Sequence, residues 1–193
     1  MANKDAPFGL RLSRSGNGSD LANMQNKYRI AANYDTSIFQ GDLVKGVTGG
    51  GIERVVAGAT DLILGVFNGC RYTDPSSGKE TFSNYYPADT NAADIEAFVI
   101  DAPNAVFEIQ ADAAMPVADL FGNFDIVSTA GDTASGISRV ELGVSTGATT
   151  AGLALKAIDI STDPENSDVS SANTNVVVMI NNHLFSAGTA GLA

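Results

Sequence analysis

The residues that could most directly do chemistry are a glycine-flanked serine and the single histidine. Ser145 lies between Gly143 and Gly147 in the pattern Gly-x-Ser-x-Gly. Asp163 and His183 follow it in the chain order of an α/β-hydrolase triad. In that chemistry the serine attacks a carbonyl carbon and the histidine takes its proton. The nucleophile must sit between a parallel strand and a helix, and the next residues, Ala-Thr-Thr-Ala-Gly, predict no helix. A small serine hydrolase is therefore only a remote alternative, and we do not expect an enzyme.

Metal-binding chemistry has little support in the sequence. Any site that needs imidazole must use His183 alone, and we expect this residue at the surface or hydrogen-bonded near the chain end. The acidic run from Asp159 is not an EF-hand loop, because Pro164 and Ser170 replace its glycine and its bidentate acid. We expect no metal and no cofactor, although an irregular calcium site stays open.

The composition predicts one soluble β-rich domain. The chain has 193 residues, of which 44% are hydrophobic, and it contains 20 glycines and no tryptophan. A domain of this size buries roughly 70% of its unfolded surface. Ala, Thr, Ser, Asn and Asp are frequent, which favours strands and turns over long helices. The strongly apolar run at 176–180 is too short to span a bilayer, so we expect neither a membrane partner nor a secretion signal.

The charge is unevenly distributed. The net charge of −11 argues against nucleic acid as the main partner. Residues 1–29, however, carry five of the eleven basic side chains and only two acids, a net of +3, which leaves −14 for the other 164 residues. We predict an extended N-terminal arm over 1–24, a single β-rich domain over 25–185 and a flexible tail over 186–193. The arm has no strand or helix period, and it could order on an acidic neighbouring surface.

The regular stretch 38–87 should organise the fold. A hairpin is expected where the runs 43–47 and 52–56 meet across a triple glycine. The run 62–72 is apolar in both alternations, which is typical of a central strand covered on both faces. Its glycines, Gly65 and Gly69, indicate a bulge or the close approach of another backbone. A turn then returns the chain through a second hairpin.

The other elements are read from the same patterns. Residues 94–101 and 105–110 predict a further antiparallel hairpin, with Asp94 and Glu96 on its solvated face. Segment 113–121 is the only plausible helix, and the sequence of 128–152 predicts a long surface loop. Strands are expected at 123–127, at 152–160 with a bulge near Lys156, and at 174–181. Tyr28 and Ile30 should lie on an edge strand. The fold class is all-β, an antiparallel β-barrel or sandwich with an extended N-terminal arm and one short helix.

Five stretches of the sequence resemble the capsid decoration (cement) proteins of marine and cyanobacterial tailed bacteriophages. They begin with Met-Ala-Asn-Lys-Asp-Ala-Pro-Phe-Gly-Leu-Arg at residues 1–11. The others are the segments 34–44, 64–72, 103–112 and 178–183. None of these segments is a catalytic fingerprint, and region 128–152 has no counterpart.

The resemblance implies a virion structural protein, made in the host cytoplasm and bound to the outer surface of the expanded head. Its partners would be the major capsid protein and two further copies of itself in a homotrimer. We expect five side chains to contact the capsid: Phe8, Arg11, Arg14, Lys27 and Arg29. We also expect the fold to survive removal of residues 2–20. The alternative is a low-copy tail or head-fibre component that binds glycans or a host surface through Tyr72, Phe82, Tyr85 and Tyr86.

Overall fold

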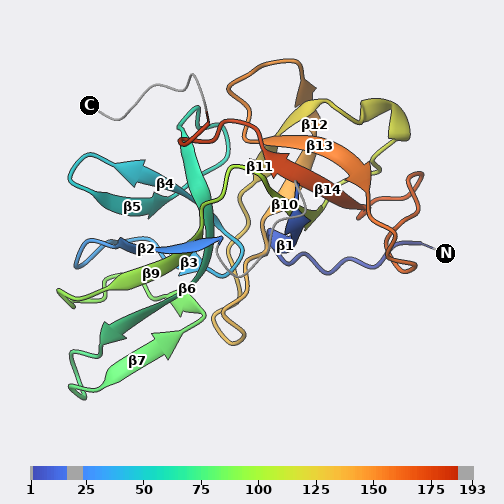
Figure 1. Cartoon of the computed structure of the whole chain (residues 1–193). Helices are drawn as coiled ribbons and strands as arrows, with labels where there is room; N and C mark the ends of the chain where they lie inside the picture. Colours follow the sequence, from blue (N-terminus) through green and yellow to red (C-terminus); the bar gives the residue numbers. More distant parts are fainter. Residues whose placement is uncertain (1, 17–23, 187–193) are drawn as a thin grey trace.

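The computed structural model describes residues 2–16 and 24–186, and this part of the chain is built of β-strands (Figure 1). Fourteen strands fall into two six-stranded sheets and one small two-stranded sheet within the described residues. The all-β prediction is therefore confirmed. The predicted tail over 186–193 lies outside the described residues from 187 onward.

The first large sheet runs in the order β1-β10-β14-β13-β11-β12, and its strand pairs are antiparallel. Its strands are β1 Arg11–Ser15, β10 Ala105–Gln110, β11 Asn123–Val127, β12 Glu141–Ala148, β13 Leu155–Ile160 and β14 Asn175–Ile180. The second large sheet runs β4-β5-β2-β9-β6-β7. Its strands are β2 Gln25–Arg29, β4 Leu43–Val47, β5 Gly51–Arg54, β6 Ile63–Thr73, β7 Glu80–Ser83 and β9 Glu96–Ile100. β3 Ile38–Phe39 and β8 Tyr85–Tyr86 form the small sheet.

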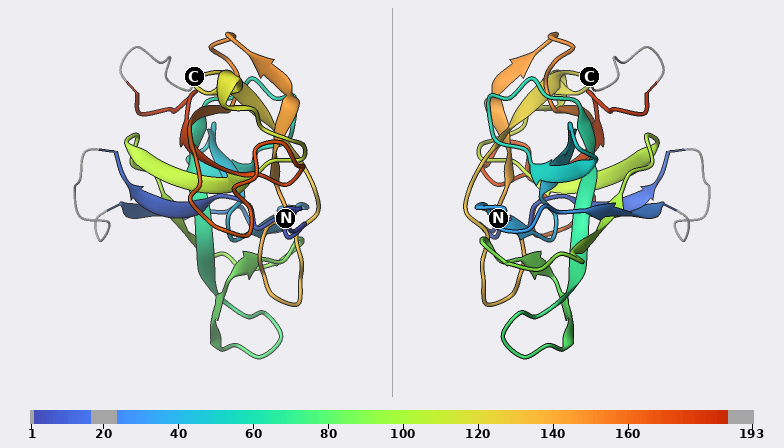
Figure 2. Two further views of the ribbon diagram at one scale, coloured as in Figure 1. Left: turned by 90° about the vertical axis from the view of Figure 1, so that its right-hand side faces the viewer. Right: turned by 90° about the vertical axis from the view of Figure 1, so that its left-hand side faces the viewer.

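The second sheet closes into a five-stranded barrel, because β4 pairs with β6 as well as with β5. β7 is left outside the ring as an extra strand, and the β6–β7 hairpin extends beyond the rest of the molecule (Figure 1, Figure 2). β2 is thus not the edge strand that the sequence predicted, since β9 flanks it on one side and β5 meets it through one parallel pair on the other.

β6 is central, as predicted, and both of its faces are buried. Leu64 and Phe67 belong to the apolar cluster of the barrel, while Ile63 and Val66 belong to the cluster shared with the first sheet. Gly65 allows β6 to lie close against β9, because a Cβ on this residue would lie 2.2 Å from the carbonyl oxygen of Ile100. The expected close approach of another backbone is therefore confirmed.

The chain crosses from one sheet to the other between β9 and β10. The sequence predicted a hairpin here, and this was wrong: β9 pairs with β2 and β6, while β10 pairs with β1 and β14. Both strands show the strand pattern clearly, but pattern alone does not say which strands pair. The turn at 101–104 carries the chain between two sheets instead of folding it back on itself.

Two further expectations needed correction. The predicted helix over 113–121 is only a 3-10 turn, η2 Val117–Asp119, since Phe121 takes a φ of +69° and its N–H donates to the carbonyl of Ala157 on β13. The predicted surface loop over 128–152 contains the eight-residue strand β12 Glu141–Ala148. Its small residues suggested a loop, yet strand pairing uses backbone groups that Ser, Thr and Gly carry as well as any residue.

The described part of the N-terminal segment lies on the chain's own body. Asn3 exchanges hydrogen bonds with the backbone of Asp168, and the Gln110 side chain binds the backbone of Lys4 and Ala6. Leu10 is buried in the shared core, and β1 pairs with β10. Removal of residues 2–20 would strip one edge of β10 and open the core, so we no longer expect the fold to survive it.

A buried ion pair joins the barrel to the loop before β12. Asp42 is fully buried, and one of its oxygens lies 3.0 Å from Nε of Arg54, whose side chain is 12% exposed. The carboxylate also accepts hydrogen bonds from the Phe39 N–H and the Ser138 hydroxyl. Burial raises the pKa of Asp42, while Arg54 and these two hydrogen bonds oppose the shift.

We predict that Asp42→Asn destabilises the protein by about 3 kcal/mol, because it leaves the guanidinium of Arg54 buried without a counter-charge. The matched control is Asp61→Asn, which breaks the exposed pair with Lys45 and should cost less than about 1 kcal/mol. Urea unfolding of both variants measures the difference. Equal free energies of unfolding for the two variants would contradict the prediction.

Candidate functional site

The basic residues predicted to contact the capsid separate into two groups. Phe8, Arg11 and Arg14 lie on or just before β1 in the first sheet, whereas Lys27 and Arg29 lie on β2 in the barrel. The four basic side chains belong to exposed residues. The sequence did not predict that the five residues divide between two sheets.

The N-terminal group has a defined geometry. The guanidinium of Arg11 lies over the ring of Phe8, 4.6 Å from its centroid, and also pairs with the Glu108 carboxylate on β10. Cation–π contact and ion pairing together hold a long side chain that remains 61% exposed. The guanidinium of Arg11 is therefore held in a defined position on β1, with its charge paired to that of Glu108.

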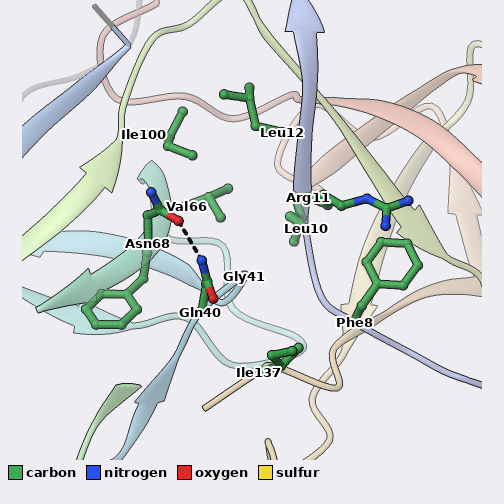
Figure 3. A pocket seen from close by; sticks show the side chains of 11 residues that line it. Phe8, Leu10, Arg11, Leu12, Gln40, Gly41, Val66, Asn68, Ile100 and Ile137 are labelled. Carbon is green, nitrogen blue, oxygen red and sulfur yellow. Dashed lines mark hydrogen bonds between the residues drawn. The ribbon is translucent and has the colours of Figure 1, made fainter. Parts of the chain in front are cut away.

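A cavity of about 410 Å³ lies beside this segment, between it and the barrel (Figure 3). Phe8 and Arg11 stand on one side of it, and a hydrogen bond joins Gln40 to Asn68 on the other. Its apolar lining comes mainly from Leu10, Leu12, Val66, Phe67, Ile100 and Ile137. Such a pocket suits an apolar side chain better than a charged or strongly polar ligand.

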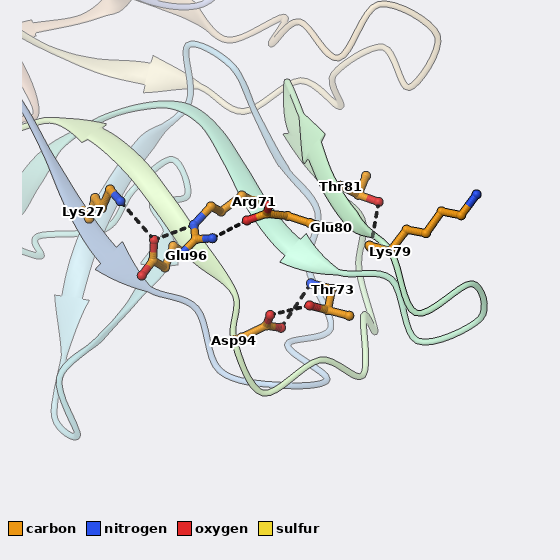
Figure 4. Close-up of polar contacts among 8 residues, drawn as sticks. All are labelled: Lys27, Arg71, Thr73, Lys79, Glu80, Thr81, Asp94 and Glu96. Carbon is orange, nitrogen blue, oxygen red and sulfur yellow. Dashed lines mark hydrogen bonds and ion pairs between the residues drawn. The ribbon is translucent and has the colours of Figure 1, made fainter.

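Of the two basic residues in the barrel, Lys27 belongs to a row of alternating charges on four adjacent strands (Figure 4). Lys27 on β2 lies 3.4 Å from the Glu96 carboxylate on β9, which accepts a hydrogen bond from Arg71 on β6. Arg71 pairs in turn with Glu80 on β7. We call these four residues the charge ladder. Asp94 lies beside it and accepts hydrogen bonds from the backbone and hydroxyl of Thr73.

The ladder perturbs the titration of its members. The hydrogen bond from Arg71 is the main cause that lowers the pKa of Glu96, and the contacts with Lys27 add to it. Hydrogen bonds to Glu96 and Glu80 raise the pKa of Arg71. Asp94 also has a lowered pKa, because Thr73 hydrogen-bonds its ionised form. The predicted solvated face of Asp94 and Glu96 thus carries a structural network.

The four aromatic residues of the glycan-binding alternative do not form one surface. Tyr72 and Tyr86 are buried in the barrel core. Tyr85 stacks on Phe39 with ring centroids 5.3 Å apart, and only Phe82 is strongly exposed, at 68%. Two of the four side chains on which that alternative was based are therefore too deeply buried to contact a glycan at the surface.

The residues of the hydrolase alternative are also far from the arrangement that it needs. Ser145 lies within strand β12 and not on a strand-to-helix turn. His183 is fully buried and hydrogen-bonded near the end of the described chain, which is the second of the two settings expected for it. Its Nδ1 accepts a hydrogen bond from the Phe185 N–H, and burial lowers its pKa. Within the described residues its Nε2 has no hydrogen-bond partner, Ser145 included.

The acidic loop after β13 is held by internal hydrogen bonds. Asp168 accepts from Ser170 and Ser171, and Asp163 accepts from the Glu165 N–H. Over residues 2–16 and 24–186 no group of three or more His, Cys, Asp or Glu is arranged to hold a metal ion. In the same ranges no helix is long and apolar enough to cross a membrane.

Comparison with known proteins gives no further assignment. The chain matches no protein-family model, and neither the curated proteins nor the solved structures contain a significant match to it.

Sequence reasoning missed the charge ladder and the open edge beside it. Arg71 and Glu80 lie on the two strands that flank the loop 74–79, and opposite charges in such positions are a usable sign of cross-strand pairing. Lys27 and Glu96 could not be paired in advance, because 66 residues separate the end of β2 at Arg29 from the start of β9 at Glu96.

We predict that the stabilising effect of Glu96 depends on pH. The pKa of this carboxyl is lowered in the folded state from its ordinary 4.5, so its contribution is complete above that value and disappears as the pH falls through the folded pKa. Thermal unfolding should show Glu96→Gln less stable than the parent protein at pH 7, with the gap in Tm closing as the pH falls below 4.5 and through the lowered pKa of Glu96.

The control for this experiment is Glu165→Gln in the exposed acidic loop. It should show a small difference in Tm at neutral pH. A Glu96→Gln difference that stays constant from pH 7 to pH 3 would show that the ladder does not act through the charge of Glu96.

Proposed function

We propose that this chain is a virion structural protein that binds the outer surface of an expanded phage head and stabilises the contacts between capsomers. The observation that carries the proposal is the ordered basic segment before and on β1, in which Arg11 and Arg14 are exposed on an otherwise acidic protein. The similarity of five sequence segments to decoration proteins supports the same conclusion.

Charge is the physical basis of the proposed contact. The N-terminal basic side chains would bind an acidic area of the major capsid protein, while the acidic body faces solvent and keeps the bound copies soluble. Phe8 and the adjacent apolar cavity would add a desolvated contact in the middle of this charged surface. Lys27 and Arg29 would contribute from the barrel.

Repetition makes a modest contact sufficient. A homotrimer bound at a three-fold position engages three equivalent capsid surfaces at once, and the second and third contacts form at high effective concentration. Each protomer therefore needs only a small interface with the head. The trimer and its position on the lattice are part of the proposal.

The copy number in purified virions tests the proposal most directly. Quantitative mass spectrometry should give a ratio to the major capsid protein near one to one, as expected for decoration of the whole lattice. A handful of copies per particle would instead support a tail or head-fibre component, and absence from virions would overturn a structural role.

A charge reversal tests the proposed contact residue by residue. Arg14→Glu should weaken binding to heads that lack this protein by about tenfold, because it places a like charge against an acidic surface at every copy. The control Lys79→Glu makes the same change in net charge at an exposed residue of the loop between β6 and β7, and it should bind like the parent protein. Co-sedimentation with heads measures both, and equal losses would show that the effect is not local to β1.

A further inference from the structure

The outer edge of β7 has no partner within the described residues. β7 is the last strand of its sheet and pairs only with β6. Its residues are Glu80, Thr81, Phe82 and Ser83, and the hairpin that carries it extends away from the body (Figure 1). An exposed strand edge is a template on which another extended chain can pair.

The hydrogen-bonding pattern shows which backbone groups face outward. The Asp74 N–H donates to the carbonyl of Lys79, so this pair bonds across the hairpin, whereas the Thr73 N–H donates to Asp94 on the other side. Antiparallel pairs alternate between bonded and non-bonded. Thr81 and Ser83 therefore bond to β6, and the N–H and C=O groups of Glu80 and Phe82 point away from it.

The side chains at this edge lack the partners that a further strand would supply. Across the charge ladder the sign alternates from Lys27 to Glu96, Arg71 and Glu80, and it ends with the acid at the open edge (Figure 4). Phe82 lies on the same face, directly opposite Arg71, and is 68% exposed. The next strand in the sheet would extend this pattern with a basic residue beside Glu80 and an apolar residue beside Phe82.

We propose that β7 is a docking edge for an extended segment of another protein, which pairs with it as an added strand and places a basic and an apolar side chain at alternate positions. A second copy of β7 does not fit this description. Its only basic neighbour, Lys79, alternates with Glu80 and so falls on the opposite face of the strand. The proposal is independent of head binding through β1.

Short synthetic peptides provide the test. The probe is an acetylated and amidated peptide, Thr-Lys-Thr-Leu-Thr-Lys-Thr, and its control carries Glu in place of each Lys. Binding is followed by the amide NMR signals of the full chain. We expect the basic peptide to slow hydrogen exchange at the Glu80 and Phe82 amides, and the acidic peptide to bind about fivefold less tightly.

Two variants separate the backbone contribution from that of charge. Phe82→Pro removes an outward N–H and leaves the bonds of Thr81 and Ser83 to β6 in place, so it should abolish peptide binding. Phe82→Ala keeps that N–H and should retain weakened binding. Glu80→Lys should reverse the preference between the two peptides. Unchanged exchange at the Tyr72 and Thr81 amides verifies that the hairpin remains folded.

Several outcomes would overturn the proposal. These are equal binding of the acidic and basic peptides, binding by Phe82→Pro at the level of Phe82→Ala, or amide shifts confined to β1 and its cavity. Concentration-dependent protection of the Glu80 and Phe82 amides without peptide would assign the edge to a second copy and would also overturn it. None of these measurements uses phage heads, so a failure here leaves the proposed function untouched, and the reverse also holds.

Discussion

The carboxylate of Asp42 holds three segments that belong to different parts of the chain. It binds Arg54 at the end of β5, the backbone of Phe39 in β3 and the hydroxyl of Ser138 before β12. The backbone of Asp42 also accepts the Phe67 N–H from β6. Because a buried charge is tolerated only with its full set of partners, these segments must be placed together or not at all.

The long strand β6 transmits that constraint to both apolar clusters. It pairs with β4, β7 and β9, and it gives some side chains to the barrel and others to the core shared with the first sheet. Gly65 lets the backbone of β9 approach to a distance that no side chain would permit. The charge ladder lies on the outer face of the same strands, so its geometry follows from the way the barrel closes.

Local features of the fold could be predicted from the sequence, and long-range pairings could not. The hairpin at Gly49–Gly51, the two-sided burial of β6 and the register shift in β13 each leave a signal within a few residues. The place of β9 and β10 in different sheets leaves none, because their patterns are compatible with either pairing. β12 was missed since Ser, Thr and Gly are typical of loops. For the site, exposure of Arg11 and Arg14 was predictable, whereas the contacts with Phe8 and Glu108 required the fold.

The order of the strands along the chain has a consequence for synthesis. All six strands of the barrel sheet come from residues 25–100, whereas β10, in the other sheet, is flanked by β1 from residues 11–15 and β14 from residues 175–180. As the chain leaves the ribosome, the barrel has all its strands well before the first sheet does. β1 emerges first, but it cannot pair until β10 has been made. β10 in turn gains its second neighbour only when β14 has been made. The basic segment on β1 thus takes its final place in the sheet only after β14 has been made, although it is among the first parts of the fold to be synthesised.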